Sequence, residues 1–308
     1  MTALRQILSD YLRLRRGLGY ELERDGLELE QFVDFLDEAG AEHITTEAAL
    51  RWARVPAHQH PVVWRHRLSR VRGFARYAAT IDPSTEIPAG DLLRAHQPRT
   101  PPYIYSSQEI ARLVAAARSL QPPLTAATFA TAIGLMACTG IRLREVIALD
   151  RDDVDLVDGA VDIRASHNHG QRLVPLHPTA TTALTQYARV RDEHRPSPAI
   201  RAFFVSRLGR RLIKTSFWLT FRELIREAGL EGRGERVRPR PHDLRHMFAV
   251  QTLIGWYRSG GDVERRMPTL STYLGHVSPD STYWYLQSVP ELQALVSERL
   301  EWVAEGLS

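Results

Sequence analysis

The chain has very little cysteine and very little lysine. Its 308 residues include one cysteine, Cys138, and one lysine, Lys214, so that 39 of the 40 basic residues are arginine. A single cysteine excludes a disulfide framework and a metal site built on several thiolates, and it fits a reducing cytosol. The lysine follows Ile213 without a glycine-rich loop, which excludes the phosphate-binding loop of nucleoside triphosphatases.

Long apolar runs are absent as well. The N-terminus lacks a basic-then-apolar leader, and no run of 18 apolar residues occurs. We therefore expect a cytoplasmic protein that neither is secreted nor contacts a membrane. The composition, 44% hydrophobic and 25% charged, is that of an ordinary globular protein. At about 100–200 residues per domain, the length predicts two domains or one large one.

The net charge of +4 is unevenly distributed. Residues 1–50 hold 5 arginines and 11 acidic residues, a net charge of −6, whereas residues 51–98 have a net charge of +5 and residues 201–245 one of +7. Two basic segments suggest surfaces for a polyanion, because phosphate neutralisation supplies much of the affinity for nucleic acids. Solvated helix faces in an arginine-rich protein are the alternative explanation.

Apolar spacing predicts a helical domain over residues 1–98. Two amphipathic helices are expected within residues 3–40, a third in residues 45–52, and a fourth from about residue 60 to residue 79. The fourth helix carries five arginines: Arg65, Arg67, Arg70, Arg72 and Arg76. Prolines and small polar residues are typical of an extended linker, which we place at residues 99–107.

Residues 108–308 are predicted to form a second domain, mainly α-helical with a small antiparallel β-sheet. Short strand-like runs occupy residues 154–156, 160–165 and 172–176, and a hairpin turn is expected between the last two. Helices dominate again after residue 178. An apolar helix expected over residues 290–303 either docks into a neighbouring subunit or packs within its own chain.

Two segments combine arginine with groups that could support it at a phosphate. In Thr139–Glu145, a turn glycine precedes a helix whose first turn holds Arg142 and Glu145, where the free N–H groups of the helix end add to the field felt by an anion. His242 and Arg245 lie three residues apart, on one face of a second predicted helix. Either pair taken alone also fits a structural role at a helix start.

A third segment adds a histidine and two tyrosines. Gly275 suits a helix C-cap that presents His276 in a loop, and Tyr283 and Tyr285 follow in an aromatic run. Aromatic runs usually pack in a core. Together, however, the arginines can stabilise the charge of a phosphoryl transition state, the histidines can move protons, and a tyrosine can attack phosphorus.

In this order and spacing, the segments resemble the tyrosine recombinase/integrase family. Residues 1–98 are similar to the family's helical core-binding domain, and residues 102–308 to its catalytic domain. The family's nucleophile typically follows the histidine of the L-G-H segment by nine residues, which points to Tyr285, with Tyr283 as the alternative. The T-G-x-R-x-x-E, H-x-L-R-H and L-G-H segments imply the other catalytic residues: Arg142 with the supporting Glu145, His242, Arg245 and His276.

The sequence departs from the family at one catalytic position. The family usually carries a lysine in the hairpin before an R-L-V-P-L-like strand, and residues 172–176 match that strand, but no lysine precedes them. His167 lies where the lysine is expected, and a histidinium could protonate the departing 5′-oxygen. His169 and Arg172 are other candidates, although arginine is a poor acid because its pKa stays above about 12. Lys214 could also reach the site from elsewhere, or the turn has lost its acid and the enzyme is slow or inactive.

The resemblance implies DNA cleavage and rejoining through a 3′-phosphotyrosyl bond, with no metal or nucleotide cofactor. The implied partners are double-stranded DNA in the bacterial nucleoid and a homo-tetramer assembled on it, with or without related recombinases. A type IB topoisomerase-like relaxing enzyme and a catalytically weak DNA-binding accessory subunit are the alternatives. The basic side chains expected to contact DNA are Arg65, Arg67, Arg70, Arg72, Arg76, Arg172, Arg210, Arg211, Lys214, Arg238 and Arg240.

Overall fold

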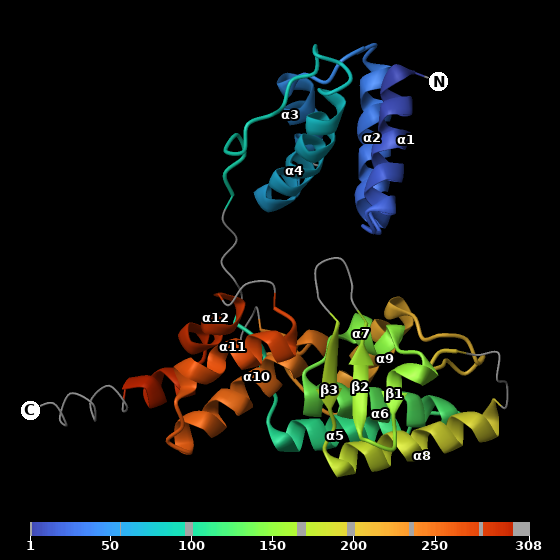
Figure 1. Cartoon of the computed structure of the whole chain (residues 1–308), viewed down its shortest axis with the longest axis vertical. Coiled ribbons are helices and arrows are strands. Elements are labelled where there is room, and N and C mark those ends of the chain that lie inside the picture. Colours follow the sequence, from blue (N-terminus) through green and yellow to red (C-terminus); the bar gives the residue numbers. More distant parts are fainter. Residues whose placement is uncertain are drawn as a thin grey trace, which may run out of the picture. The chain divides into compact units, whose positions relative to one another are not determined.

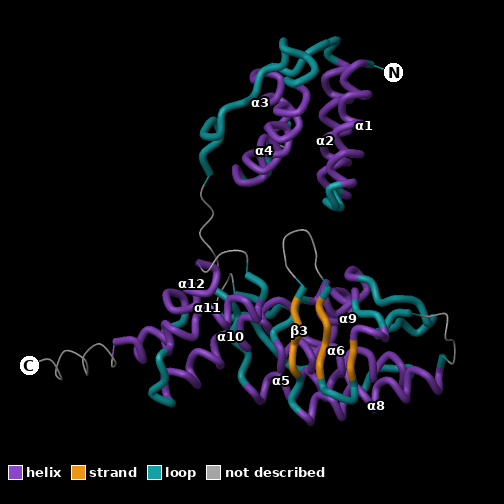
Figure 2. The backbone as a smooth tube through the Cα atoms, in the orientation of Figure 1, coloured by secondary structure: helices purple, strands orange, loops and turns teal. Residues whose placement is uncertain are grey.

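The chain forms two compact units, Met1–Arg99 and Thr100–Ser308. The computed structural model describes residues 2–55, 57–95, 101–164, 171–195, 201–233, 237–276 and 280–297. Both units are mainly helical (Figure 1), and the strands of the described chain all belong to the second unit (Figure 2). Among the described residues, no helix is both long and apolar enough to cross a membrane.

The first unit contains the four predicted helices, which are α1 (Ala3–Gly17), α2 (Glu23–Glu38), α3 (Thr46–Arg54) and α4 (Pro61–Ala78). Helix α4 packs against the other three. Phe32 and Phe74 are fully buried in its core, and Trp52 lies against Phe32 with ring centroids 5.2 Å apart. Residues of this size bury enough apolar surface to hold four short helices together.

The second unit surrounds a central helix, α6 (Pro123–Thr139). This helix is apolar on nearly all sides and packs against α5 (Ser107–Arg118), α8 (Pro178–His194) and α10 (Pro241–Arg258). The remaining helices of the described chain are α7 (Leu143–Ala148), a 3₁₀ turn η1 (Arg151–Asp153), α9 (Lys214–Glu227), α11 (Val263–Leu274) and α12 (Asp280–Ser288). In Figure 1, α10, α11 and α12 lie together at one end of this unit.

The predicted sheet is confirmed. Strands β1 (Val154–Asp155), β2 (Ala160–Ile163) and β3 (Arg172–Pro175) form an antiparallel sheet in that order, with Val161 opposite Val174. These two valines are buried, so one face of the sheet covers the core. The fold class expected from the sequence, mainly α with a small antiparallel sheet, is therefore correct. The expected hairpin turn, with His167 and His169, lies outside the described residues.

The segment predicted to be a linker contributes to the core of the second unit. Tyr103 and Tyr105 are both buried, with ring centroids 4.9 Å apart. Tyr105 donates a hydrogen bond to the carbonyl oxygen of Arg240 at 3.1 Å, which attaches residues 101–106 to the start of α10. The two prolines before them gave this stretch the appearance of a pure linker, because local composition does not reveal long-range packing.

The C-terminal apolar segment packs within its own chain as far as it is described. Residues 290–297 are helical, and Leu292 is fully buried in a cluster that also contains Val289 and Leu253 of α10. Leu295 lies against the same cluster. The other half of the expected helix, residues 298–303, lies outside the described residues.

Gly140 ends α6 in a conformation that a side chain would disturb. Its φ is +65°, and a Cβ atom there would lie 2.6 Å from the ring of Phe248. We expect Gly140→Ala to lower the free energy of unfolding by about 2 kcal/mol or more, from left-handed backbone strain and overpacking together. Gly134→Ala is the matched control, because Gly134 lies within α6 and a Cβ atom there meets nothing within 4 Å. It should be neutral or stabilising by up to about 1 kcal/mol in urea denaturation. Equal effects of the two substitutions would contradict this account.

Candidate active site

Glu145 is the acceptor for two arginine side chains. Its carboxylate accepts from Arg142 Nη1 at 3.0 Å and from Arg172 Nη1 and Nη2 at 3.0 and 2.8 Å, and it also accepts from the Arg142 backbone N–H at 2.8 Å. Burial raises the pKa of Glu145, but the hydrogen bonds from Arg172 and Arg142 outweigh burial and hold that pKa below its ordinary value. The carboxylate therefore stays ionised and fixes both guanidinium groups.

Three arginines also donate to three successive carbonyl groups at the end of α11. Arg172 Nε donates to the carbonyl of Tyr273 at 2.8 Å, Arg245 Nη2 donates to that of Leu274, and Arg142 Nη2 donates to that of Gly275 at 2.8 Å. The last carbonyls of a helix lack partners within the helix and carry its negative partial charge. The C-terminus of α11 is thus fixed by cations from α7, β3 and α10.

Arg172 was expected to contact DNA, and the structure places it in the interior. Its side chain is only 8% exposed, and it forms the bidentate ion pair with Glu145. An arginine at the first position of a short strand resembles a surface residue in the sequence. The buried carboxylate of Glu145 explains the difference, because a desolvated charge of one sign needs a partner of the other.

Arg245 and His242 lie at the start of α10. Arg245 is 1% exposed and donates Nη1 to the carbonyl of Gly140 at 2.9 Å. Burial, followed by repulsion from Arg142, lowers the pKa of Arg245 to about 9. The His242 ring reaches solvent, yet the protein around it and the charges of Arg245 and Arg142 lower its pKa to about 4. At neutral pH the site therefore presents cationic arginines beside a neutral His242.

The two candidate tyrosines of α12 differ in environment. Tyr285 is 1% exposed, whereas Tyr283 is 43% exposed. Burial raises the pKa of Tyr285 to about 12, although the charges of Arg245 and Arg142 oppose that shift. Of the two hydroxyl groups, that of Tyr285 is the one subject to the field of the site's arginines.

His276 directly follows the left-handed Gly275 that ends α11. Its Nδ1 lies 2.7 Å from Oγ1 of Thr282 on α12, and its ring centroid lies 6.5 Å from that of Tyr285. The structure thus gathers Arg142, Glu145, His242, Arg245, His276 and Tyr285 around the ends of α6, α10 and α11. These side chains come from segments up to 143 positions apart in the printed sequence.

One site residue was not singled out by the sequence. His246 Nδ1 lies 2.8 Å from the Tyr285 hydroxyl, and its ring centroid lies 4.6 Å from that of His242. The signal was present in the sequence, because His246 is the last residue of the H-x-L-R-H segment. It could be used only once α12 was known to pack on this face of α10.

Several of the arginines expected to bind DNA have partners within the first unit. Arg70 pairs with Asp25 and Glu28, Arg67 stacks on Trp52, and Arg72 donates to a backbone carbonyl. Arg65 is exposed and donates to the Ala95 carbonyl, and Arg76 is exposed without a hydrogen bond or ion pair to the described residues. The predicted basic face therefore retains its most available charges at Arg65 and Arg76.

In the second unit, the predicted basic residues also divide into paired and open side chains. Arg211 pairs with Asp150, and Arg240 pairs with Asp243. The exposed side chains that have no hydrogen-bond or ion-pair partner among the described residues are Arg210, Lys214 and Arg238. Lys214 is the first residue of α9, and the structure shows no contact between it and Tyr285.

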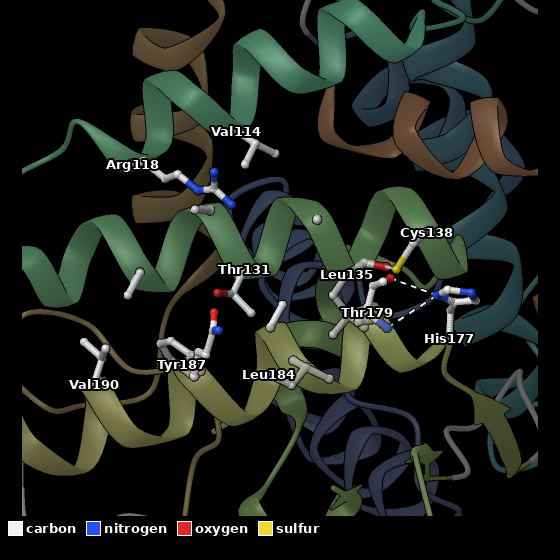
Figure 3. Close-up of a pocket in the computed structure, with 16 residues that line it drawn as sticks. Val114, Arg118, Thr131, Leu135, Cys138, His177, Thr179, Leu184, Tyr187 and Val190 are labelled. Atoms are coloured by element: carbon white, nitrogen blue, oxygen red, sulfur yellow. Dashed lines mark hydrogen bonds between the residues drawn. The ribbon is translucent and has the colours of Figure 1, made fainter.

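A groove of about 410 Å³ lies along α6 and α8, away from the residues just described (Figure 3). Its lining is mostly apolar, and His177 and Cys138 lie near one end. Cys138 was interpreted as a buried hydrophobic residue, which is wrong, since the structure exposes it in this groove. No predicted site residue lines the groove.

The described residues contain no group of three or more His, Cys, Asp or Glu side chains suited to a metal ion. Glu145, the carboxylate among the gathered residues, is occupied by Arg142 and Arg172. What the arrangement can do chemically is hold an anion against Arg142 and Arg245, next to the Tyr285 hydroxyl and a set of histidine rings.

Comparison with known sequences gives a consistent result. A model of the phage integrase family matches residues 104–291. The integrase/recombinase y4rB of Sinorhizobium fredii is 40% identical over 307 residues, which cover 98% of each chain. The tyrosine recombinase XerC of a Roseiflexus species is 33% identical over 170 residues, which cover 53% of this chain and 49% of that protein.

Solved structures share the fold. The Tn1549 transposon integrase, in complex with transposon right end DNA, has a TM-score of 0.67 at 14% identity and covers 98% of this chain and 100% of its own. A lambda integrase dimer bound to a COC′ core site has a TM-score of 0.60 at 17% identity, with 91% and 97% covered. At these identities, the likeness concerns the fold alone.

The double ion pair of Glu145 predicts a pH-dependent stability. Because the folded-state pKa lies below the ordinary value of about 4.3, its stabilisation is present above that pH and is lost as the pH falls through the folded-state pKa. We expect Glu145→Gln to lower the free energy of unfolding at pH 7 by up to about 3–5 kcal/mol, since it leaves two buried guanidinium groups uncompensated. The gap between variant and wild type should narrow below about pH 4.

Glu291→Gln is the matched control for this substitution. Glu291 pairs with Arg258 at 2.9 Å, but both side chains are more than half exposed. Its removal should change stability by less than about 1 kcal/mol. Urea denaturation at pH 7 and pH 3.5 compares the variants, and a Glu145→Gln effect as small as that of Glu291→Gln would contradict the prediction.

Proposed function

The chain belongs to the phage integrase family of tyrosine recombinases, which transfer DNA strands, and we propose that Tyr285 is its nucleophile. The observation that supports this proposal is the burial of the Tyr285 hydroxyl beside the histidines of a site whose arginines lie close enough to act on its pKa. Arg142 and Arg245 are the proposed phosphate-binding residues. The relatives reported above are integrases and recombinases, which favours recombination over relaxation of supercoils or a non-catalytic accessory role.

In the proposed reaction, Tyr285 attacks the scissile phosphate and forms a 3′-phosphotyrosyl bond while the 5′-oxygen departs. Arg142 and Arg245 bind the non-bridging oxygens, whose charge grows in the transition state. Glu145 acts on the reaction through Arg142, because it fixes that guanidinium from behind. His242 and His276 assist in charge stabilisation and proton transfer. The phosphodiester energy is kept in the covalent bond, so the rejoining step needs no nucleotide.

The general acid remains a prediction. His167, in the position where the family carries its lysine, is our candidate, with His169 as the neighbouring alternative, and both lie outside the described residues. Arg172 is a weaker candidate than the sequence suggested, because it is committed to Glu145 and to the Tyr273 carbonyl. Lys214 has no contact in the structure that links it to the site.

The partner is double-stranded DNA, and the proposed assembly is a homo-tetramer on DNA, with or without related recombinases, in the bacterial nucleoid. Exchange of two duplexes requires four cleavages, so four active sites must meet. The first unit is the proposed core-binding domain, with Arg65 and Arg76 of α4 as backbone contacts. Arg210, Lys214 and Arg238 are the proposed contacts of the catalytic unit.

A nicked suicide substrate tests the nucleophile. We expect wild-type protein to form a covalent protein–DNA adduct that resists denaturation in SDS, because loss of the short cleaved strand prevents religation. Tyr285→Phe should reduce the adduct by at least about 10⁴-fold, to below detection, since no other hydroxyl replaces the nucleophile. Tyr283→Phe is the matched control and should retain it. An adduct that persists in Tyr285→Phe and vanishes in Tyr283→Phe would overturn the assignment.

DNA affinity at varied salt tests the role of α4. Arg76→Ala should weaken binding and reduce the slope of log affinity against log salt by about 0.9, the value for one lost phosphate contact. Arg24→Ala is the control, because Arg24 is exposed on α2 but pairs with Glu28 at 3.1 Å in the acidic part of the chain. Fluorescence anisotropy with a labelled duplex measures both slopes. The same slope for wild type and Arg76→Ala would show that this arginine does not contact phosphate.

A further inference from the structure

The Tyr285 hydroxyl has a hydrogen-bond partner that the reaction above does not use. Within the described part of the chain, that partner is His246, whose Nδ1 lies 2.8 Å from Oη. The two rings meet edge to face at a centroid distance of 5.4 Å, and Trp284 packs against the same imidazole at 5.8 Å. His276 uses its own Nδ1 for Thr282, at 2.7 Å. The histidine hydrogen-bonded to the nucleophile is therefore His246.

The direction of this hydrogen bond follows from the charge states of the two groups. Burial, followed by repulsion from His242 and Arg245, lowers the pKa of His246 to about 3, so the imidazole is neutral. Burial raises the pKa of Tyr285 to about 12, so the phenol keeps its proton. The phenol O–H thus donates and Nδ1 accepts, with the remaining imidazole proton on Nε2. The phenolic proton already points at a basic nitrogen.

We propose that His246 accepts the phenolic proton of Tyr285 while Tyr285 attacks the scissile phosphate, an inference that rests on the proposed function. The O–H bond of Tyr285 breaks and its proton moves to Nδ1, while a bond forms between Oη and phosphorus. The bond from phosphorus to the 5′-oxygen breaks, and that oxygen leaves with the bonding electrons and takes a proton from water or from the general acid. His246 returns its proton to Tyr285 when a 5′-hydroxyl resolves the phosphotyrosyl bond.

The geometry meets the first requirement for a general base, which is hydrogen-bond reach of the proton it removes. Basicity is the second requirement, and the bound phosphate supplies part of it. Its negative charge, held against Arg142 and Arg245, offsets the cations that make imidazolium unfavourable in the free protein. The titratable or charged groups that act on the His246–Tyr285 pair are His242, Arg245, Arg240 and Asp243 of the α10 start, Arg142 of α7, and His276.

His246→Asn separates proton acceptance from positioning. The asparagine side chain oxygen can accept a hydrogen bond from the phenol but cannot take its proton. We expect cleavage of the suicide substrate at pH 7 to slow by at least about 100-fold, with unchanged DNA affinity in anisotropy. Above pH 7 the residual rate should rise about tenfold per pH unit, because the fraction of tyrosinate grows in that way well below a pKa of about 12. His194→Asn, on the exposed end of α8, is the matched control and should cleave like wild type.

A second variant covers the case in which asparagine disturbs the fold. His246→Ala removes the ring, and added imidazole should restore cleavage by at least about tenfold, which a purely structural role would not allow. A substrate with a 5′-bridging sulfur, whose leaving group needs no proton, should leave the His246→Asn defect undiminished.

Three results would overturn the proposal: cleavage by His246→Asn within about threefold of wild type, absence of rescue by imidazole, or recovery of His246→Asn on the sulfur substrate. The last result would assign His246 to the leaving group. Failure of the proposed function has a different signature, namely an adduct that Tyr285→Phe still forms. The two hypotheses therefore fail in separate experiments.

Discussion

The site depends on the way in which one carboxylate and three arginines hold the C-terminus of α11. Glu145 binds Arg142 and Arg172, and these two, together with Arg245, donate to the carbonyls of residues 273, 274 and 275. Buried charges are stable only when they are paired and hydrogen-bonded, so each member of the group requires the others. Since α11 leads to His276 and then to α12, the same group determines where the histidine and the tyrosine stand.

The charge balance of this group explains its chemistry. Three guanidinium groups share one carboxylate, so the free site carries a surplus of positive charge in a poorly hydrated environment. That surplus lowers the pKa of Arg245, His242 and His246, and it opposes the rise in the pKa of Tyr285. A phosphodiester anion is the ligand that removes this imbalance, so binding and activation of the site are the same electrostatic event.

The sequence predicted the secondary structure and the gathering of the site well, but it predicted contacts across the fold poorly. Periodicity located the four helices of the first unit and all three strands, because these patterns depend on near neighbours. It could not reveal that Arg172 is internal or that Tyr103 is a core residue, because each depends on a partner supplied from another element. For the same reason, five arginines on one helix suggested a uniform basic face, whereas Arg70 is neutralised by α2.

The scarcity of lysine acquires a physical meaning at this site. Each of the three arginines makes at least two hydrogen bonds in different directions, to a backbone carbonyl and to Glu145 or to a second carbonyl. A planar guanidinium with five donors can do this while it stays charged, whereas an ammonium group is a compact point charge that loses its proton more readily when buried. The property that suits arginine to this framework makes it a poor acid. A chain that builds its site from arginine must therefore move protons with other groups, and histidines lie on both sides of the Tyr285 ring.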